Sequence, residues 1–132
     1  MSIQVPPDDL TETVRGFGGA YLVTVGGDRR AHIVAVTPAP GEDGLDLGEP
    51  GRTTRRNLQQ NPAVSLVWPP LKPGGHSLIA DGTGSLRGDV LVVRPTRAVL
   101  HRPGPDAAGP DTPGATERAD GGCVADCAEV RL

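Results

Sequence analysis

The chain has 132 residues, a formal net charge of −3 at pH 7, and 19 glycines and 14 prolines that together make up a quarter of it. No apolar run approaches the roughly 20 residues that span a bilayer, and residues 1–10 lack the apolar stretch of a secretory signal. Composition therefore predicts a cytoplasmic protein with no membrane partner. Only Phe17, Tyr21 and Trp68 are aromatic, so we expect a thin aliphatic core that a homodimer completes.

The N-terminal segment predicts a short helix. Residues 7–17 carry apolar side chains at helical spacing, with Asp8 or Asp9 available as the cap. The pair Gly18-Gly19 is predicted to end this helix.

Two β-rich runs follow, at residues 20–25 and 31–37. Between them, Gly26-Gly27-Asp28 is predicted to supply the positive φ of a tight reversal, so the segment reads as a β-hairpin. Both runs are almost continuously apolar, and we therefore expect both of their faces to be covered, by a barrel or by a barrel packed on a partner.

A second helix is predicted in the middle of the chain. Residues 38–44 are typical of a turn, and 45–47 alternate like a short strand. Residues 52–60 contain good helix formers, with Thr53 or Thr54 as the cap and Asn61-Pro62 as the stop.

The rest of the domain is predicted to be β-structure with strands 8–12 residues apart, which favours a small closed sheet. The predicted strands are 63–68, 76–85, 89–94 and 96–101, with Pro95 at a bulge or edge.

Three segments are expected along the chain: a domain at 1–102, a flexible Gly/Pro-rich tail at 103–122, and a cysteine-containing segment at 123–132. Residues 103–122 contain no Val, Leu, Ile or aromatic residue. Such a segment buries too little apolar surface to offset the entropy of ordering.

The start of the second helix is the strongest candidate for a binding site. Residues 51–80 contain no acidic residue and four basic ones. Helix N–H donors, threonine hydroxyls and arginine guanidinium groups combine at GRTTRRN, residues 51–57, and together suit a phosphate. The alternative is that Thr53 only caps the helix and the arginines lie in solvent.

Other reactive residues carry weaker signals. His32 interrupts an apolar strand, and His76 and His101 lie near strand ends, where isolated histidines are usually structural. No His or acidic pair has ligand spacing on one element, so no metal site is predicted. Cys123 and Cys127 are interpreted as inert thiols or a reversible local disulfide.

Common catalytic and nucleotide motifs are not found. The sequence has no G-x-S-x-G and no P-loop, and the G-x-G at residues 82–84 is followed by a predicted strand rather than a helix. Single-strand nucleic-acid binding is not expected, because such sites use exposed aromatic residues as stacking platforms. No catalytic residue is assigned.

Four stretches, at 20–38, 51–70, 76–86 and 92–103, carry a resemblance to a known family. The most specific is N-L-x-x-N-P-x-V-S-L at residues 57–66. These stretches resemble the pyridoxamine 5′-phosphate oxidase-like, FMN-binding split-barrel family, in particular its short actinobacterial-type members. The resemblance implies a mainly β fold, a six-stranded split β-barrel with one or two short helices, paired as a homodimer with cofactor grooves at the interface.

The resemblance also implies the cofactor contacts. The second strand of such proteins runs along the isoalloxazine ring of FMN, and the matching residues are His32, Ile33, Val34 and Ala35. Basic and hydroxyl residues hold the phosphate, and the matching residues are Arg52, Thr53, Thr54, Arg55 and Arg56.

Two departures from the family pattern bear on function. The chain lacks the C-terminal substrate-binding portion of pyridoxamine-phosphate oxidases and the lysine that many members place before the helix. The cofactor is thus left open between FMN, a deazaflavin and none. We expect a flavin-binding oxidoreductase-like protein acting on a small molecule, with a non-enzymatic carrier of a flavin or small anion as the alternative.

Overall fold

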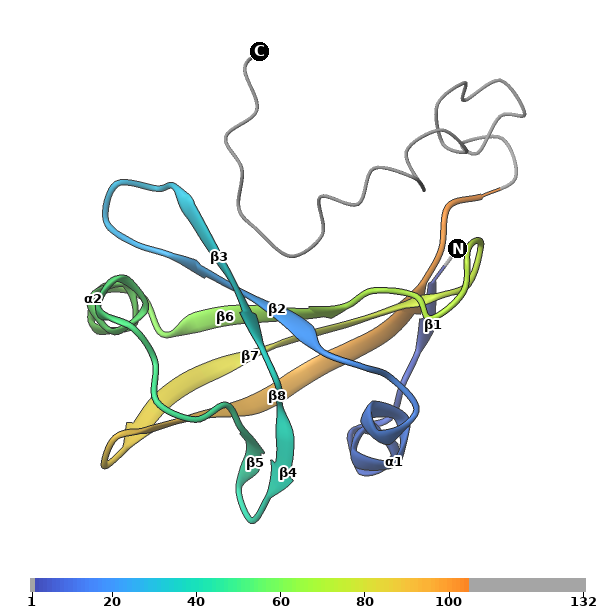
Figure 1. The fold of residues 1–132 in the computed structure, drawn as a ribbon, viewed down its shortest axis with the longest axis horizontal. Coiled ribbons are helices and arrows are strands. Elements are labelled where there is room, and N and C mark those ends of the chain that lie inside the picture. Colours follow the sequence, from blue (N-terminus) through green and yellow to red (C-terminus); the bar gives the residue numbers. More distant parts are fainter. Residues whose placement is uncertain (1, 105–132) are drawn as a thin grey trace. The chain divides into compact units, whose positions relative to one another are not determined.

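The computed structural model describes residues 2–104, in which the residues up to Arg102 form one compact unit. Eight antiparallel strands of this region form one curved sheet (Figure 1). The strands are β1 (Ser2–Gln4), β2 (Ala20–Val25), β3 (Ala31–Val36), β4 (Ala39–Gly41), β5 (Gly44–Asp46), β6 (Ala63–Trp68), β7 (Ser77–Arg87) and β8 (Val90–His101). The helices are the 3-10 turn η1 (Pro7–Asp9), α1 (Leu10–Arg15) and α2 (Arg52–Gln60).

The sheet is organised around the long strand β8. Its order is β3-β2-β6-β7-β8-β5-β4, and β1 pairs separately with β8. One edge of β8 pairs with β7, whereas the other pairs with β1 near His101 and with β5 near Val93. Because β3 and β4 at the two ends of this path do not pair with each other, the sheet is open there.

The prediction of a mainly β chain is confirmed, but the strand count of six is wrong. Residues 38–44, predicted as a turn, contain β4, because Ala39–Gly41 pairs with Gly44–Asp46 around a two-residue turn. The three residues of β1 are too few to show a periodic pattern, and they pair with residues almost a hundred positions away.

The predicted strands at 89–94 and 96–101 are one continuous strand, with a bulge beside Pro95 as the sequence indicated. Asp81 pairs with Arg97 and Gly82 with Pro95, so Thr96 is the extra residue of β8. Gly82 is required at this point, because a Cβ there would lie 2.5 Å from the carbonyl oxygen of Arg94.

The first helix is confirmed in position but not in its ends. The α-helix stops at Arg15, before the predicted glycine pair, and neither aspartate caps it through its side chain. Asp9 adopts a helical conformation because η1 runs into α1, and its carbonyl accepts a bond from the Thr13 hydroxyl at 2.8 Å. The predicted apolar face is buried through Leu10 and Val14.

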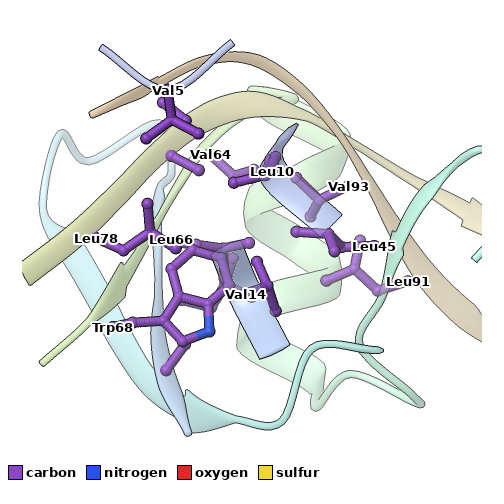
Figure 2. Packing of buried hydrophobic residues seen from close by; sticks show 14 of the residues in the cluster. Val5, Leu10, Val14, Leu45, Val64, Leu66, Trp68, Leu78, Leu91 and Val93 are labelled. Carbon is purple, nitrogen blue, oxygen red and sulfur yellow. The ribbon is translucent and has the colours of Figure 1, made fainter. Parts of the chain in front are cut away.

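The core lies on the concave side of the sheet and is aliphatic, as expected, around a single tryptophan. Trp68 is fully buried, and Figure 2 shows its indole ring beside Leu66 and Val14. Leu91 and Val93 of β8 and Leu45 of β5 complete the cluster toward the opposite end. Helix α1 thereby closes the sheet where the strands alone would leave apolar residues in water.

The predicted β-hairpin between β2 and β3 is confirmed, but its turn conformation is not. The positive φ falls on Arg29, at 63°, rather than on a glycine. The Arg29 amide donates to the carbonyl of Gly26 at 3.1 Å, and the Asp28 carboxylate accepts from the amide of Arg30 at 3.0 Å. The turn is therefore held by backbone and aspartate bonds and carries backbone strain at an arginine.

Arg29→Gly is expected to raise the free energy of unfolding by roughly 1 kcal/mol, because glycine adopts a positive φ without the Cβ clash. Urea unfolding followed by circular dichroism measures the change. The matched control is Arg30→Gly, which removes an arginine from ordinary backbone and is expected to lower stability by about 0.5–1 kcal/mol. A loss of stability in Arg29→Gly would contradict the strain at this position.

The prediction that β2 and β3 are covered on both faces does not hold within one chain. Alternate residues of β3 point away from the core, and Ile33 is 59% exposed. On the adjoining strand Tyr21 is 47% exposed, in register with Ala35. This outer face, with Val23 between them, is an exposed apolar surface formed by β2 and β3.

No helix among residues 2–104 is long and apolar enough to cross a membrane. The tail predicted at 103–122 lies outside the described residues except for its first two positions, and so does the segment with Cys123 and Cys127.

Candidate functional site

A cavity of about 330 Å³ lies between β3, the segment that precedes α2 and the first turn of α2. Its apolar lining consists of Leu22, Val34, Ala35, Val36, Leu47, Pro50 and Leu91. Its remaining lining consists of His32, Glu49, Gly51, Arg52, Thr53 and Thr54. A cavity that combines an apolar wall with converging polar groups is the usual composition of a small-molecule site.

The first turn of α2 supplies the polar end of the cavity. Gly51 is the N-cap in extended conformation and no side chain caps the helix, which corrects the prediction that Thr53 or Thr54 does so. Both threonines lie inside the first turn instead, and Thr54 is 2% exposed. Backbone N–H groups at the start of a helix have no partner within it and favour negative charge, and no acidic side chain occupies this turn.

The fold brings the two predicted segments, β3 and the start of α2, to one cavity. Six of the nine predicted residues line it: His32, Val34, Ala35, Arg52, Thr53 and Thr54. Ile33 does not, since successive strand residues alternate between faces and its side chain lies on the exposed outer surface. Arg55 and Arg56 are outside the lining, and Arg56 is exposed on α2.

Arg55 is engaged by the segments around the cavity. Its Nε donates to the carbonyl oxygen of Pro50 at 3.2 Å. Its Nη2 lies 3.5 Å from Oε1 of Glu49 and 3.8 Å from Oδ1 of Asp89. This guanidinium therefore ties the start of α2 to the preceding segment and to the turn between β7 and β8.

Sequence reasoning missed Glu49, the one carboxylate in the cavity lining. It also missed Leu47 and Leu91, which are joined by a hydrogen bond from the Leu47 amide to the Leu91 carbonyl at 2.9 Å. Glu49 lies just before the acid-free stretch that begins at Gly51, so the charge pattern pointed away from it. Leu91 is far away in sequence, and its pairing to this segment depends on the tertiary fold.

Helix α2 is fixed against the sheet by a buried polar contact. The Asn57 Nδ2 donates to the Thr24 Oγ1 at 3.1 Å, and both residues are buried. At the end of the helix the Gln60 Oε1 accepts from the amide of Gly27 at 2.6 Å. The two glycines of the hairpin thus serve close approach to α2, since a Cβ on Gly26 would lie 2.3 Å from the Asn57 Oδ1.

Gly26→Ala is expected to lower the free energy of unfolding by about 1–3 kcal/mol, because the new methyl group overlaps an Asn57 side chain that its bond to Thr24 holds in place. Chemical denaturation measures the loss. Gly18→Ala is the control, with nothing within 4 Å of its Cβ, and its change is expected to stay below about 1 kcal/mol. Equal stability of the two variants would contradict the close approach.

The other sequence candidates lie elsewhere. His101 Nδ1 is 3.0 Å from Ser2 Oγ across the β1–β8 pair, and His76 lines a separate apolar hollow with Phe17 and Leu100. Within residues 2–104 no group of three or more His, Cys, Asp or Glu side chains is arranged to hold a metal ion.

One carboxyl group away from the cavity has a perturbed pKa. A hydrogen bond and the charge of Arg87 hold the pKa of Asp43 below its usual value. This pair joins the β4–β5 turn to β7 on the exposed side of the sheet, so it is a surface contact and not part of the candidate site.

Searches of known proteins give relatives in sequence and in structure, although no family model matches the chain. The uncharacterized proteins Mb0449c of Mycobacterium bovis and MT0457 of Mycobacterium tuberculosis are each 42% identical to it over 124 residues. Each alignment covers 82% of this chain and 82% of the mycobacterial protein.

Solved structures with the same fold have much lower identity. A provisionally assigned pyridoxamine 5′-phosphate oxidase of Listeria innocua has a TM-score of 0.59 and 18% identity, over 71% of this chain and 96% of its own. An FAD-binding protein of Mesorhizobium loti has a TM-score of 0.59 and 12% identity, over 76% and 95%. The heme-storage protein HutZ of Vibrio cholerae has a TM-score of 0.55 and 14% identity, over 74% and 94%.

Proposed function

We propose that this chain, which belongs to the family of the two mycobacterial proteins, binds a flavin-type cofactor and acts as an oxidoreductase on a small molecule. Its fold is the split barrel of pyridoxamine 5′-phosphate oxidase-like proteins. FMN is the first candidate and a deazaflavin the second. The observation that carries the proposal is the composition of one cavity, apolar along β3 and rich in anion-binding groups at α2.

The two ends of this cavity suit the two ends of such a cofactor. Val34 and Val36 present an apolar strand surface to a planar ring, and His32 adds a ring nitrogen beside them. Arg52, the hydroxyl of Thr53 and the open N–H groups of α2 suit a phosphate monoester. A phosphorylated, partly planar ligand fits this distribution better than a wholly apolar one.

A bound flavin ring supplies the hydride or electron transfer itself, so the protein's task is to bind, orient and exclude water. In this chain the apolar side chains of β3 and Leu91 would exclude water from the ring, and the start of α2 would complement the negative charge of the phosphate. No acid–base pair is required among the lining residues for this role.

The direct test is titration of the purified protein with FMN, a deazaflavin and heme, followed by absorbance and fluorescence. We expect saturable flavin binding, weakened by about 1–3 kcal/mol in Arg52→Ala because a charge-assisted phosphate contact is lost. Arg56→Ala is the control, since this exposed arginine of the same helix is outside the cavity. Binding of heme but of no flavin, or of nothing, would overturn the proposal.

A carrier or storage role is the second candidate, favoured by the shared fold of HutZ. Such a protein would hold its ligand without turning it over. Reduction of the bound flavin by NADPH, NADH or a reduced deazaflavin separates the two roles. Rapid reduction supports an oxidoreductase, whereas a bound flavin that none of the three reduces supports a carrier.

We propose further that the protein is a homodimer through the outer face of β2 and β3. Ile33 and Tyr21 are about half exposed there, beside Val23 and Ala35. A contiguous exposed apolar surface on a small domain is the usual mark of a protein interface. The cavity is adjacent to this surface, because Ala35 lies on the outer face of β3 and also lines the cavity.

Ile33→Lys is expected to convert a dimer to a monomer, because it introduces a charge into the proposed interface. Light scattering coupled to size-exclusion chromatography measures the mass. Leu71→Lys is the matched control, since Leu71 is similarly apolar and 67% exposed but lies outside this surface. A wild-type protein that is monomeric at tens of micromolar would refute the dimer.

A further inference from the structure

The arginines at the start of α2 suggest a purely cationic site, but the cavity lining also contains a carboxylate. Glu49 lines the cavity and Arg55 does not, although Arg55 is on the helix that supplies the anion-binding end. A carboxylate beside an anion site repels the anion unless a cation neutralises it. The role of Arg55 therefore has to be derived from what it contacts.

Arg55 is anchored on three sides. Its Nε donates to the carbonyl of Pro50, and its Nη2 is shared between Glu49 at 3.5 Å and Asp89 at 3.8 Å. Its side chain is 31% exposed, whereas those of Glu49 and Asp89 are 73% and 84% exposed. The arginine is thus the most buried member of the trio, and the two carboxylates are exposed to solvent.

Only one of these two carboxylates can act on a bound ligand directly. Glu49 belongs to the cavity lining together with Arg52 and Thr53, and Asp89, in the β7–β8 turn, does not. Both lie near the same guanidinium and each carries one negative charge. They are therefore a matched pair that differs in access to the cavity.

We infer that Glu49 limits the affinity of the site for phosphorylated ligands, and that Arg55 is a positioning residue that holds and neutralises this carboxylate instead of contacting the phosphate. The inference rests on the proposed function in taking a phosphorylated flavin as the ligand. Glu49 lowers the advantage of FMN over its uncharged analogue riboflavin, and Arg55 restores part of it. The phosphate itself is left to Arg52, Thr53 and the N–H groups of α2.

The test compares FMN and riboflavin affinities in the wild type, Glu49→Gln and Asp89→Asn by fluorescence titration. Glu49→Gln is expected to increase the FMN-to-riboflavin affinity ratio about two- to fivefold, the size of an exposed charge interaction. Asp89→Asn is expected to leave the ratio unchanged. An unchanged or lower ratio in Glu49→Gln, or an equal increase in both variants, would overturn the inference.

Arg55→Gln in two backgrounds distinguishes a positioning residue from a phosphate ligand. In the wild type it is expected to reduce the FMN-to-riboflavin ratio about two- to fivefold, because Glu49 is no longer neutralised. In the Glu49→Gln background the reduction is expected to be clearly smaller, because only the through-space attraction of the guanidinium itself is then lost. An equal reduction in both backgrounds would show that Arg55 acts on the phosphate and not through Glu49, which would overturn the inference. A general loss of folding would lower both affinities without changing their ratio in either background, which also counts against it.

Inorganic phosphate provides a readout that does not depend on flavin binding. The rise in melting temperature at increasing phosphate concentration, at constant ionic strength, is expected to be larger in Glu49→Gln than in the wild type or Asp89→Asn. If no flavin binds, the proposed function fails while this comparison still decides the role of Glu49. Equal phosphate responses in all three proteins would overturn the inference.

Discussion

The buried hydrogen bond from Asn57 to Thr24 is the contact on which the candidate site depends. It links the interior of α2 to β2 through two buried side chains, at 3.1 Å. Its loss would leave a buried amide or hydroxyl unpaired, which costs more than the bond itself contributes. The position of the helix start relative to β3 follows from this contact together with the packing of Leu58 in the core.

Glycine on the sheet side makes that contact possible. The hairpin carries no Cβ at Gly26 or Gly27, so Asn57 and Gln60 approach its backbone closely. A Cβ on Gly84 of β7 would likewise lie 2.8 Å from Leu58 of the helix. Gly26, Gly27 and Gly84 therefore all serve the close packing of one helix on the sheet.

Local sequence patterns predicted most of the elements and the polar helix start of the cavity, and the family resemblance added three residues of β3, but the long-range contacts were not predicted. The helix at 52–60 was identified by its helix formers and its Asn-Pro stop, and the hairpin strands by two apolar β-rich runs around a glycine-rich turn. The positive φ at Arg29 was missed because two nearby glycines were the expected positions for it. The cavity position of Glu49 was missed because it depends on neighbours brought in by the fold. Alternation along β3 also explains why Ile33 lies outside the cavity although His32 and Val34 on either side of it line the cavity.

The pairing of β1 with the end of β8 ties the two ends of the domain together. Ser2 is in register with His101, and Ile3 with Leu100. Because a chain is synthesised from its N-terminus, β1 cannot pair until almost the whole domain, up to the end of β8, has been made. Closing so long a loop is entropically costly and raises the contact order, which slows folding relative to proteins with local contacts. The N-terminal strand is accordingly among the last parts of this sheet that can form during synthesis, together with the start of β7, which pairs with the same residues of β8.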